Sequence, residues 1–554
     1  MPHATSMPSP GLQALILCGP GSSFPTFTSD PDGNPKALLP IANRPMVWYA
    51  IDFCYRMGIT DITLVCPPSS AEAITVALNT NPFLTALPLP RPDILAPVDL
   101  DFNTGTAEIL RLTEITELVK SDFVILPCDL VCEIEGEKLL QAWAVKSSSL
   151  SQSLGSSKQW KDSALAHSGG LGVFYDAKAD TPIKKEETDF IATSPVPASP
   201  IPAPKGSIFP KLSKLVYSMP TDTLKDLTEE KKGLPVRHGL LRSNPRVRMF
   251  TKHRDAHIYI FPRWILDFVK ENERLDSIAE DVVGWWAKAG WQSGLADKLK
   301  IRDILSKQGQ SDEVEATGDA PSPHEQSFSD KTAAQIRGSS QSPTQGTSLD
   351  AGDQKKGIRV PPMLAYMHSG TSQAPGSLIR RVDTAQLLLA ISLQLAKVPS
   401  LEEAGAEPPS PYAHSKKVAY PEGIKSRTTV TKQDCLIAEN VTIEEKTSIK
   451  ECVIGAGCQI NEGAKLSQCL LMEGVVIGKA CKLTKCILGK RCVIGDGSVL
   501  TDCEVQENLM VEPKTEDKDN KLMSSEGLEA TEAEMEEVLQ EDEIMDSEEA
   551  AITG

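Results

Sequence analysis

The chain has 554 residues, of which 40% are apolar, and a formal charge of −18 at pH 7. Residues 515–554 contain fifteen Asp and Glu against two Lys, which amounts to −13 and leaves about −5 for the other 514 residues (−18 + 13). A near-neutral body with an acidic end lacks the basic surface that nucleic-acid binding requires, so we expect no direct nucleic-acid contact.

The sequence predicts neither a secretory signal nor a membrane span. The N-terminus MPHATSMPSPGLQALIL has no Lys or Arg ahead of its short apolar run, and no stretch of eighteen or more apolar residues occurs. In a long chain without a secretory signal, thirteen cysteines indicate reduced thiols rather than disulfides. We therefore expect a cytosolic protein that binds no membrane.

Strand-like and helix-like patterns alternate over the first 130 residues. Short runs rich in β-formers predict strands at 12–17, 62–66 and 122–127, and the segments between them predict helices at 46–57, 70–78 and 107–120. This order favours an α/β domain with a parallel sheet covered on both faces. Ligands of such sheets bind beyond the carboxyl ends of the strands, where we expect the loop at Gly19 and the carboxylate of Asp129.

Composition suggests how the rest of the chain divides. The first domain is assigned to residues 1–305, with a mobile insertion at about 147–235 whose centre, 176–206, is rich in proline. Sheet and helices are predicted to resume at 247–261 and 264–305. The remaining segments are expected to be a disordered linker (306–357), a helical connector completing the first domain (358–414), a β-helix (415–512) and an acidic disordered tail (513–554).

Two charged segments leave alternatives open. The basic run from Arg237 to Arg254 is either a docking stripe for a partner or a solvated hairpin. The acidic tail is either a solvating segment or a site for a basic partner.

The β-helix is predicted from a repeat with three steps. Aliphatic residues recur at spacings of 6, 6 and 5, and all twelve positions are Ile or Leu: Ile437, Ile443, Ile449, Ile454, Ile460, Leu466, Leu471, Ile477, Leu483, Leu488, Ile494 and Leu500. A period of 17 residues in three steps predicts three short strands per coil, with each coil stacking its aliphatic residues on the next. The fold class is therefore an α/β domain followed by a parallel β-helix, of the left-handed type.

Cysteines follow the same period at 435, 452, 469, 486 and 503. They are either a metal or redox site or a ladder of small buried residues. No CxxC pair with zinc spacing occurs, and a free Cys packs as a small hydrophobe, so we favour the buried ladder.

The segment GPGSS…NPKALLPIANRPM resembles the signature of the sugar-nucleotide pyrophosphorylases, which join a nucleoside triphosphate to a sugar phosphate. The resemblance implies a nucleotidyltransferase-like (Rossmann-like) fold. It also implies a nucleotide site in which a glycine loop wraps the triphosphate, a Pro-Lys lysine assists, a Gly-Thr-Ala segment touches the base and an Asp binds magnesium. The matching positions are Gly19, Gly21, Lys36, Arg44, Gly105, Thr106 and Asp129.

This chain departs from that signature where the phosphates would lie. Pro20 replaces a loop glycine and removes a backbone N–H, and Ser23 stands where the family has an Arg. Loss of one preorganised donor costs about 10²–10³ in rate. We therefore expect a relic site with no catalytic residue and no metal, which needs no cofactor and binds GTP or Mg²⁺ weakly at most.

Hexapeptide acyltransferases use a similar β-helix but need a histidine base in the coil. The last histidine of this chain is His414, before the coil begins, so acyl transfer is not expected.

The combination of a damaged nucleotidyltransferase-like domain and a β-helix resembles the gamma subunits of eukaryotic translation initiation factor 2B, in a fungal-like form. The segments NPRVRMFTKHRDAHIYIFPRWILDF and IEEKTSIKECVIG carry this resemblance most clearly. The related epsilon subunit adds a helical catalytic domain, whereas the coil here is followed by the acidic tail.

The resemblance implies a non-catalytic subunit of the guanine nucleotide exchange factor for initiation factor 2. Its expected partners are the epsilon subunit, the alpha, beta and delta subunits, and initiation factor 2 itself. Two alternatives are an active pyrophosphorylase using GTP and a sugar 1-phosphate, and an exchange subunit that senses nucleotide through Lys36, Thr106 and Asp129.

Overall fold

The computed structural model describes residues 10–28, 33–101, 103–147, 169–178, 186–196, 205–234, 236–244, 246–307, 359–368, 378–405 and 410–524. The predicted linker and the end of the acidic tail (525–554) lie almost wholly outside the described residues. Among the described residues, no helix is long and apolar enough to cross a membrane.

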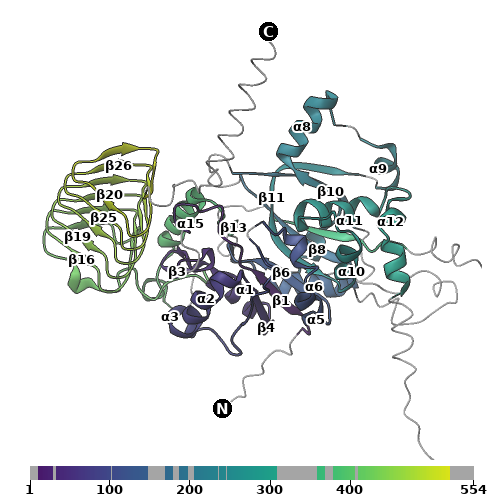
Figure 1. The fold of residues 1–554 in the computed structure, drawn as a ribbon, viewed down its shortest axis with the longest axis horizontal. Helices are drawn as coiled ribbons and strands as arrows, with labels where there is room; N and C mark the ends of the chain where they lie inside the picture. The colour runs from purple at the N-terminus through teal and green to yellow at the C-terminus, as the bar shows by residue number, and fades with distance from the viewer. Residues whose placement is uncertain are drawn as a thin grey trace, which may run out of the picture.

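A nine-stranded mixed sheet forms the centre of the first domain (Figure 1). Its order is β5-β4-β1-β6-β11-β8-β12-β10-β9, and β9 also pairs with β11. The strands are β1 (Gln13–Leu17), β4 (Asp61–Val65), β5 (Asp93–Leu95), β6 (Phe123–Pro127), β8 (Gly170–Asp176), β9 (Asp189–Pro195), β10 (Leu212–Pro220), β11 (Arg248–Phe261) and β12 (Met363–His368). The predicted strands at 12–17, 62–66 and 122–127 are confirmed as the adjacent parallel strands β1, β4 and β6.

Helices cover both faces of this sheet because apolar side chains line each face. They are α1 (Met46–Arg56), α2 (Pro68–Thr80), α3 (Pro82–Thr85), α4 (Thr106–Ile109), α5 (Thr113–Leu118), α6 (Gly136–Ser147), α8 (Thr221–Lys231), α9 (His238–Ser243), α10 (Trp264–Glu271), the π-turn η3 (Ile278–Val282), α11 (Val283–Ala289) and α12 (Leu295–Lys298). The single helix predicted at 107–120 is wrong, because a turn at 110–112 divides it into α4 and α5.

The prediction of a mobile insertion at 147–235 is wrong for its described part. β8, β9 and β10 belong to the central sheet, and α8 follows β10 directly. The proline-rich composition around 176–206 obscured the seven-residue strand β9, whose central residues are buried on pairing with β10 and β11. The residues at 148–168, 179–185 and 197–204 lie outside the described part of the chain.

The connector at 358–414 is also more than the helical segment predicted. Its first strand, β12, inserts between β8 and β10, so the sheet is incomplete without a segment that follows the predicted linker. A second strand, β13 (Ile379–Arg381), pairs with β7 (Leu130–Cys132). The predicted apolar helix is confirmed as α15 (Ala385–Lys397), which is followed by α16 (Leu401–Ala404).

The coil region forms a parallel β-helix with three strands per turn (Figure 1). Strands stack seventeen residues apart, as in the series Ile443, Ile460, Ile477 and Ile494. The three stacks begin at β14 (Thr429–Val430), β15 (Leu436–Ile437) and β16 (Thr442–Ile443), and end at β29 (Glu516–Lys518), β30 (Lys521–Leu522) and β28 (Met510–Val511). All twelve predicted Ile and Leu positions are buried, each contributing roughly 1.5–3 kcal/mol.

The coil extends past the predicted end at 512. Glu516–Lys518 pairs with the strand above it, and Leu522 pairs with Val505. Within residues 513–524 only Leu522 continues the aliphatic pattern. The acidic composition of this last turn therefore led to its assignment to the tail.

All thirteen cysteines are free and buried. Those spaced seventeen apart lie in the apolar core of the coil, and the thiol of Cys452 donates to the Lys450 carbonyl at 3.1 Å. The described residues contain no group of three or more His, Cys, Asp and Glu side chains that could hold a metal ion. The structure therefore matches the interpretation of a buried ladder.

The coil and the first domain share a core. Leu436, Val453, Leu470 and Met472 project from one face of the coil into the cluster that also contains α1 and α15. A hydrogen bond from Asn43 to the Ile454 carbonyl (3.0 Å) crosses the same boundary. The two domains are thus packed as one body.

Candidate nucleotide site

A small cavity lies at the carboxyl ends of β1 and β6, as predicted for a ligand site in this sheet. It has a volume of about 190 Å³ and is lined by Gly19, Lys36, Thr106 and Asp129, among others. Gly19 follows β1, Asp129 follows β6, and Lys36 begins the short helix η1 (Lys36–Leu38). Four of the seven residues predicted for the site therefore come together.

Asp129 is held by two cations and not by one. Its Oδ2 lies 2.8 Å from Lys36 Nζ, and its two oxygens lie 3.2 and 3.1 Å from Nε and Nη2 of Arg381. The carboxylate is 1% exposed. Burial opposes its ionisation, but Arg381 and Lys36 outweigh burial and hold the pKa of Asp129 well below its usual range.

Sequence reasoning missed Arg381. It ends β13, whose pairing with β7 places it opposite Leu130, and the Val382 amide donates to the Asp129 carbonyl at 2.8 Å. The 252 residues that separate Arg381 from Asp129 leave no local signal in the sequence. Only the strand register could have revealed it.

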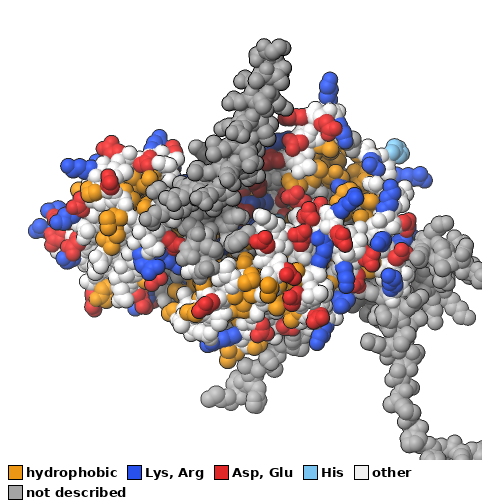
Figure 2. All heavy atoms as spheres, in the orientation of Figure 1, with side chains coloured by type: hydrophobic (Ala, Val, Ile, Leu, Met, Phe, Trp, Pro, Cys, Tyr) orange, Lys and Arg blue, Asp and Glu red, His pale blue; other side chains and the backbone are white. Residues whose placement is uncertain are grey.

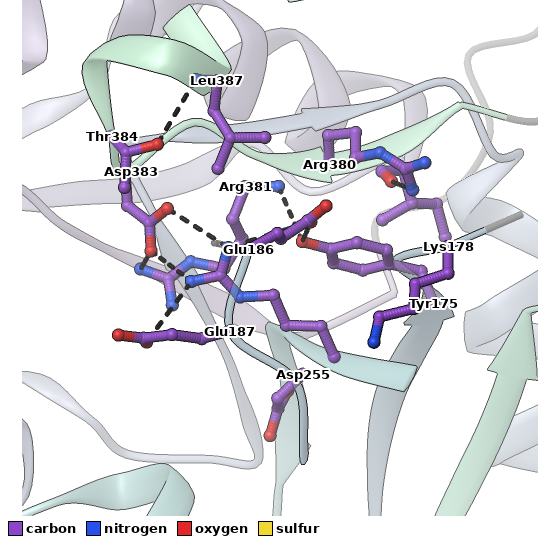
Figure 3. A network of polar contacts seen from close by, with 12 residues as sticks. Tyr175, Lys178, Glu186, Glu187, Asp255, Arg380, Arg381, Asp383, Thr384 and Leu387 are labelled. Atoms are coloured by element: carbon purple, nitrogen blue, oxygen red, sulfur yellow. Dashed lines mark hydrogen bonds and ion pairs between the residues drawn. The ribbon is translucent and has the colours of Figure 1, made fainter. Parts of the chain in front are cut away.

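Arg381 belongs to a larger buried ionic network (Figure 3). Its Nη2 lies 3.8 Å from Asp383, and Asp383 accepts two hydrogen bonds from Arg254, at 3.2 and 2.5 Å. Nη1 of Arg381 also lies 3.1 Å from Nε2 of His257, a partly buried residue whose φ is 52°. Burial and the adjacent guanidinium lower the pKa of His257 far below its usual value, so this ring is neutral and can accept from Arg381.

The glycine loop folds tightly on itself. Gly21 has φ of 89°, and a Cβ there would lie 2.9 Å from Thr28 and 3.1 Å from Lys36. The Thr28 hydroxyl reaches the Gly21 and Phe24 carbonyls at 2.8 and 2.9 Å. Gly19 differs, since a Cβ there would meet nothing within 4 Å, and it faces the cavity. The loop conformation is therefore fixed by contacts within the protein.

The Gly-Thr-Ala segment is tied to the residues ahead of η3. A Cβ on Gly105 would lie 2.3 Å from the Asp276 carbonyl, and the Ala107 amide donates to that same oxygen at 2.9 Å. The Thr106 hydroxyl accepts from the Ile278 amide at 2.9 Å. Gly105 is thus required for close packing, and the hydroxyl of Thr106 is already engaged.

Arg44 does not reach the cavity, so its assignment to the nucleotide site is not supported by position. It is buried, and its Nη1 and Nη2 donate to the carbonyls of Tyr412 and Ala413 at 2.9 and 3.0 Å. Its guanidinium carbon lies 4.4 Å from the Trp48 ring centre. Arg44 instead attaches the connector to α1.

The residues present do not fit the magnesium that the resemblance places at Asp129. Mg²⁺ needs octahedral oxygen ligands at about 2.0–2.1 Å, whereas both oxygens of Asp129 already accept from cations. A volume of 190 Å³ also falls below the roughly 300–1,000 Å³ typical of ligand pockets. In this cavity the charge of Asp129 is balanced by Lys36 and Arg381.

Comparison with known proteins finds similarity to subunits of one translation factor. Residues 419–516 match the family model described as the EIF2B subunit epsilon LbH domain. Translation initiation factor eIF2B subunit gamma of Schizosaccharomyces pombe is 27% identical over 295 residues, which are 53% of this chain and 55% of the relative. The chain is similar to eIF2B gamma subunits over about half of its length.

The same subunit of Dictyostelium discoideum is 23% identical over 246 residues, which are 43% of this chain and 47% of the relative. The chain thus spans about half the length of the curated eIF2B gamma relatives it matches. The epsilon match confirms a left-handed β-helix but covers the coil alone, so the similarity to gamma subunits rests on the two longer matches.

Proposed function

We propose that this chain is a non-catalytic structural and regulatory subunit of the guanine nucleotide exchange factor for translation initiation factor 2. In this proposal it pairs with the epsilon subunit in the cytosol and helps to dock initiation factor 2. The similarity to eIF2B gamma subunits over about half the chain supports membership of this exchange-factor complex.

The neutralisation of Asp129 by two buried cations is the observation that carries the non-catalytic part. A nucleotidyltransferase needs that carboxylate free to hold the metal that balances the triphosphate. Here Lys36 and Arg381 already supply the balancing charge. The same observation argues against an active pyrophosphorylase.

A scaffold role needs no covalent chemistry. Nucleotide exchange is promoted by contacts that favour the nucleotide-free conformation of the GTPase over its GDP-bound conformation. A β-helix that shares its core with the first domain gives the rigid surface that such selective contacts require.

The direct test is to purify the tagged chain from its own cells and to identify and size what accompanies it. We expect a complex containing an epsilon-like subunit, the other exchange-factor subunits and initiation factor 2. GDP release from initiation factor 2 should be faster with the complete complex than with epsilon alone. A solitary chain that releases pyrophosphate from GTP and mannose 1-phosphate would contradict the proposal.

A further inference from the structure

A groove of about 490 Å³ lies at the β10–β9 end of the central sheet, away from the candidate nucleotide site at β1 and β6. Here β9 and β10 meet α8, α9 and α11. Its apolar lining includes Tyr217, Trp285 and Trp291. Trp285 is 37% exposed, Val236 43% and Met249 46%, so three large apolar side chains face solvent together. Exposed apolar residues gathered around one hollow are typical of a binding surface.

The charged side chains that line this groove are all cations. Its lining contains four cations and no Asp or Glu: Lys231, Arg237, Lys288 and Lys298. Lys288 Nζ lies 4.6 Å from the Tyr217 ring centre and 4.7 Å from the Trp285 ring centre. Burial and nearby Arg237 lower the pKa of Lys288, although Asp281 opposes them. A further carboxylate beside this ammonium would stabilise its charged form.

This basic and apolar surface is unusual in a chain whose formal charge is −18. Figure 2 shows an orange patch near α8, α9 and β10, with both blue and red side chains at its border. Most of the predicted docking stripe at 237–254 lies beside it, as α9 and the start of β11. Arg254 is the exception, because it turns inward to Asp383.

The complementary segment is at the end of the same chain. Residues 525–554, here called the distal tail, contain twelve Asp and Glu and no Lys or Arg. Within it, the apolar pairs Val538–Leu539 and Ile544–Met545 flank the acidic block Glu541–Asp542–Glu543. Two apolar anchors around three carboxylates match a groove with aromatic walls and a basic rim.

The length of the tail permits the contact. In Figure 1 the coil lies at one end of the long axis and α8 lies towards the other end, so the tail has to reach across the first domain. Ile544 is twenty residues beyond Ser524, the last described residue, and an extended chain of that length spans up to about 66 Å. A domain of about 300 residues has a radius of gyration near 19 Å, so this reach exceeds its radius severalfold.

We propose that residues 538–546 of the distal tail dock in the groove of Tyr217, Trp285 and Trp291, with the acidic block against its lysines and Arg237. The docked tail covers the apolar surface and neutralises its cations. Any acidic partner segment that uses this groove must then displace the tail.

The test is zero-length carbodiimide cross-linking of the full-length isolated chain, followed by peptide mass spectrometry. We expect amide bonds from Lys231, Lys288 or Lys298 to the carboxylates of residues 541–543. They should disappear in 1 M salt, where the Debye length is about 3 Å. Mixing isotopically heavy and light chains separates bonds within one chain from bonds between two copies.

Matched variants make the test specific. Ile544→Asp combined with Met545→Asp should reduce these cross-links about tenfold or more, because the apolar anchor that follows the acidic block is lost. Ile552→Asp, outside the docking segment, should leave them unchanged. These positions lie outside the described residues, so the changes remove no contact that the structure describes. Arg237→Glu should also weaken the contact, and Asp542→Lys in that background should restore it.

Three outcomes would overturn the proposal. They are no cross-link to the groove, cross-links spread evenly to exposed coil lysines such as Lys465, and cross-links only between heavy and light chains, which would make a second copy the occupant. Because the isolated chain is used, none of these results depends on the exchange-factor role.

Discussion

Replacing Asp129 should destabilise the first domain strongly. Asp129→Ala leaves Lys36 and Arg381, whose side chains are only 12% and 14% exposed, facing each other without their shared carboxylate. Removal of one member of a buried ion pair costs about 3–5 kcal/mol, and here one carboxylate serves two cations. We therefore expect a loss in the upper part of that range. Lys36→Met should cost less, because Arg381 still pairs with Asp129.

Urea unfolding followed by tryptophan fluorescence measures this loss in the right domain, since all seven tryptophans precede the coil. Glu271→Ala is the matched control. It removes an exposed ion pair with Lys300 and should leave the midpoint unchanged. Addition of Mg²⁺ should not raise the wild-type midpoint.

The pH dependence has a definite sign. Because the pKa of Asp129 is depressed on folding, its stabilisation is fully present above its unfolded pKa of about 4 and is lost as the pH falls towards the folded value. The difference between wild type and Asp129→Asn should be constant from pH 8 to 5 and shrink below about pH 4. A neutral or stabilising Asp129→Ala, or a midpoint that rises with Mg²⁺, would refute the reasoning, since both are typical of a metal ligand under electrostatic strain.

Further predictions follow from single sites. Burial and the nearby Asp189 raise the pKa of Asp255 to about 7, although its hydrogen bonds from Tyr259 and the His257 amide oppose this shift. The free energy of unfolding should therefore fall as the pH rises from about 4 to about 7. Asp255→Asn should abolish this fall and approach wild-type stability at pH 8; an unchanged pH profile in urea would contradict it. In the coil, Gly455→Ala places a Cβ 2.7 Å from backbone and should cost several kcal/mol, whereas Gly457→Ala meets open space and should cost about 1 kcal/mol for its φ of 69°. Equal thermal shifts in the two variants would be inconsistent with that packing.

The coil could be predicted from sequence because its contacts obey a local rule. Each residue pairs with one seventeen positions away, so Ile460 and Ile477 record their own register. The three parallel strands around the candidate site were predictable for a similar reason, since an apolar run and the loop after it are adjacent in sequence. That rule places Asp129 at the edge of the sheet.

The rest depends on pairings that the sequence does not encode locally. β12 enters the centre of the sheet from beyond the predicted linker, and β13 brings Arg381 to Asp129 across 252 residues. Pro20 and Ser23 predicted a weaker grip on the triphosphate, whereas the contact that occupies Asp129 comes from Arg381. Arg44 shows the opposite failure, because its motif position suggested a phosphate contact and the fold turns it towards the Tyr412 carbonyl.

The loop that would wrap a triphosphate is also fastened to the coil. Asn34 donates to Glu507 at 2.9 Å and accepts from Lys490 at 2.7 Å, while the Thr26 hydroxyl donates to Glu504 at 3.0 Å. Thr26 and Asn34 are both buried, so a movement of the loop would break these hydrogen bonds and leave buried polar groups without partners, which is costly. The tight turn at Gly21 and these contacts together make the loop part of the boundary between the two domains. A segment that resembles a nucleotide-binding loop therefore holds the coil in place, which supports a scaffold role for this part of the chain.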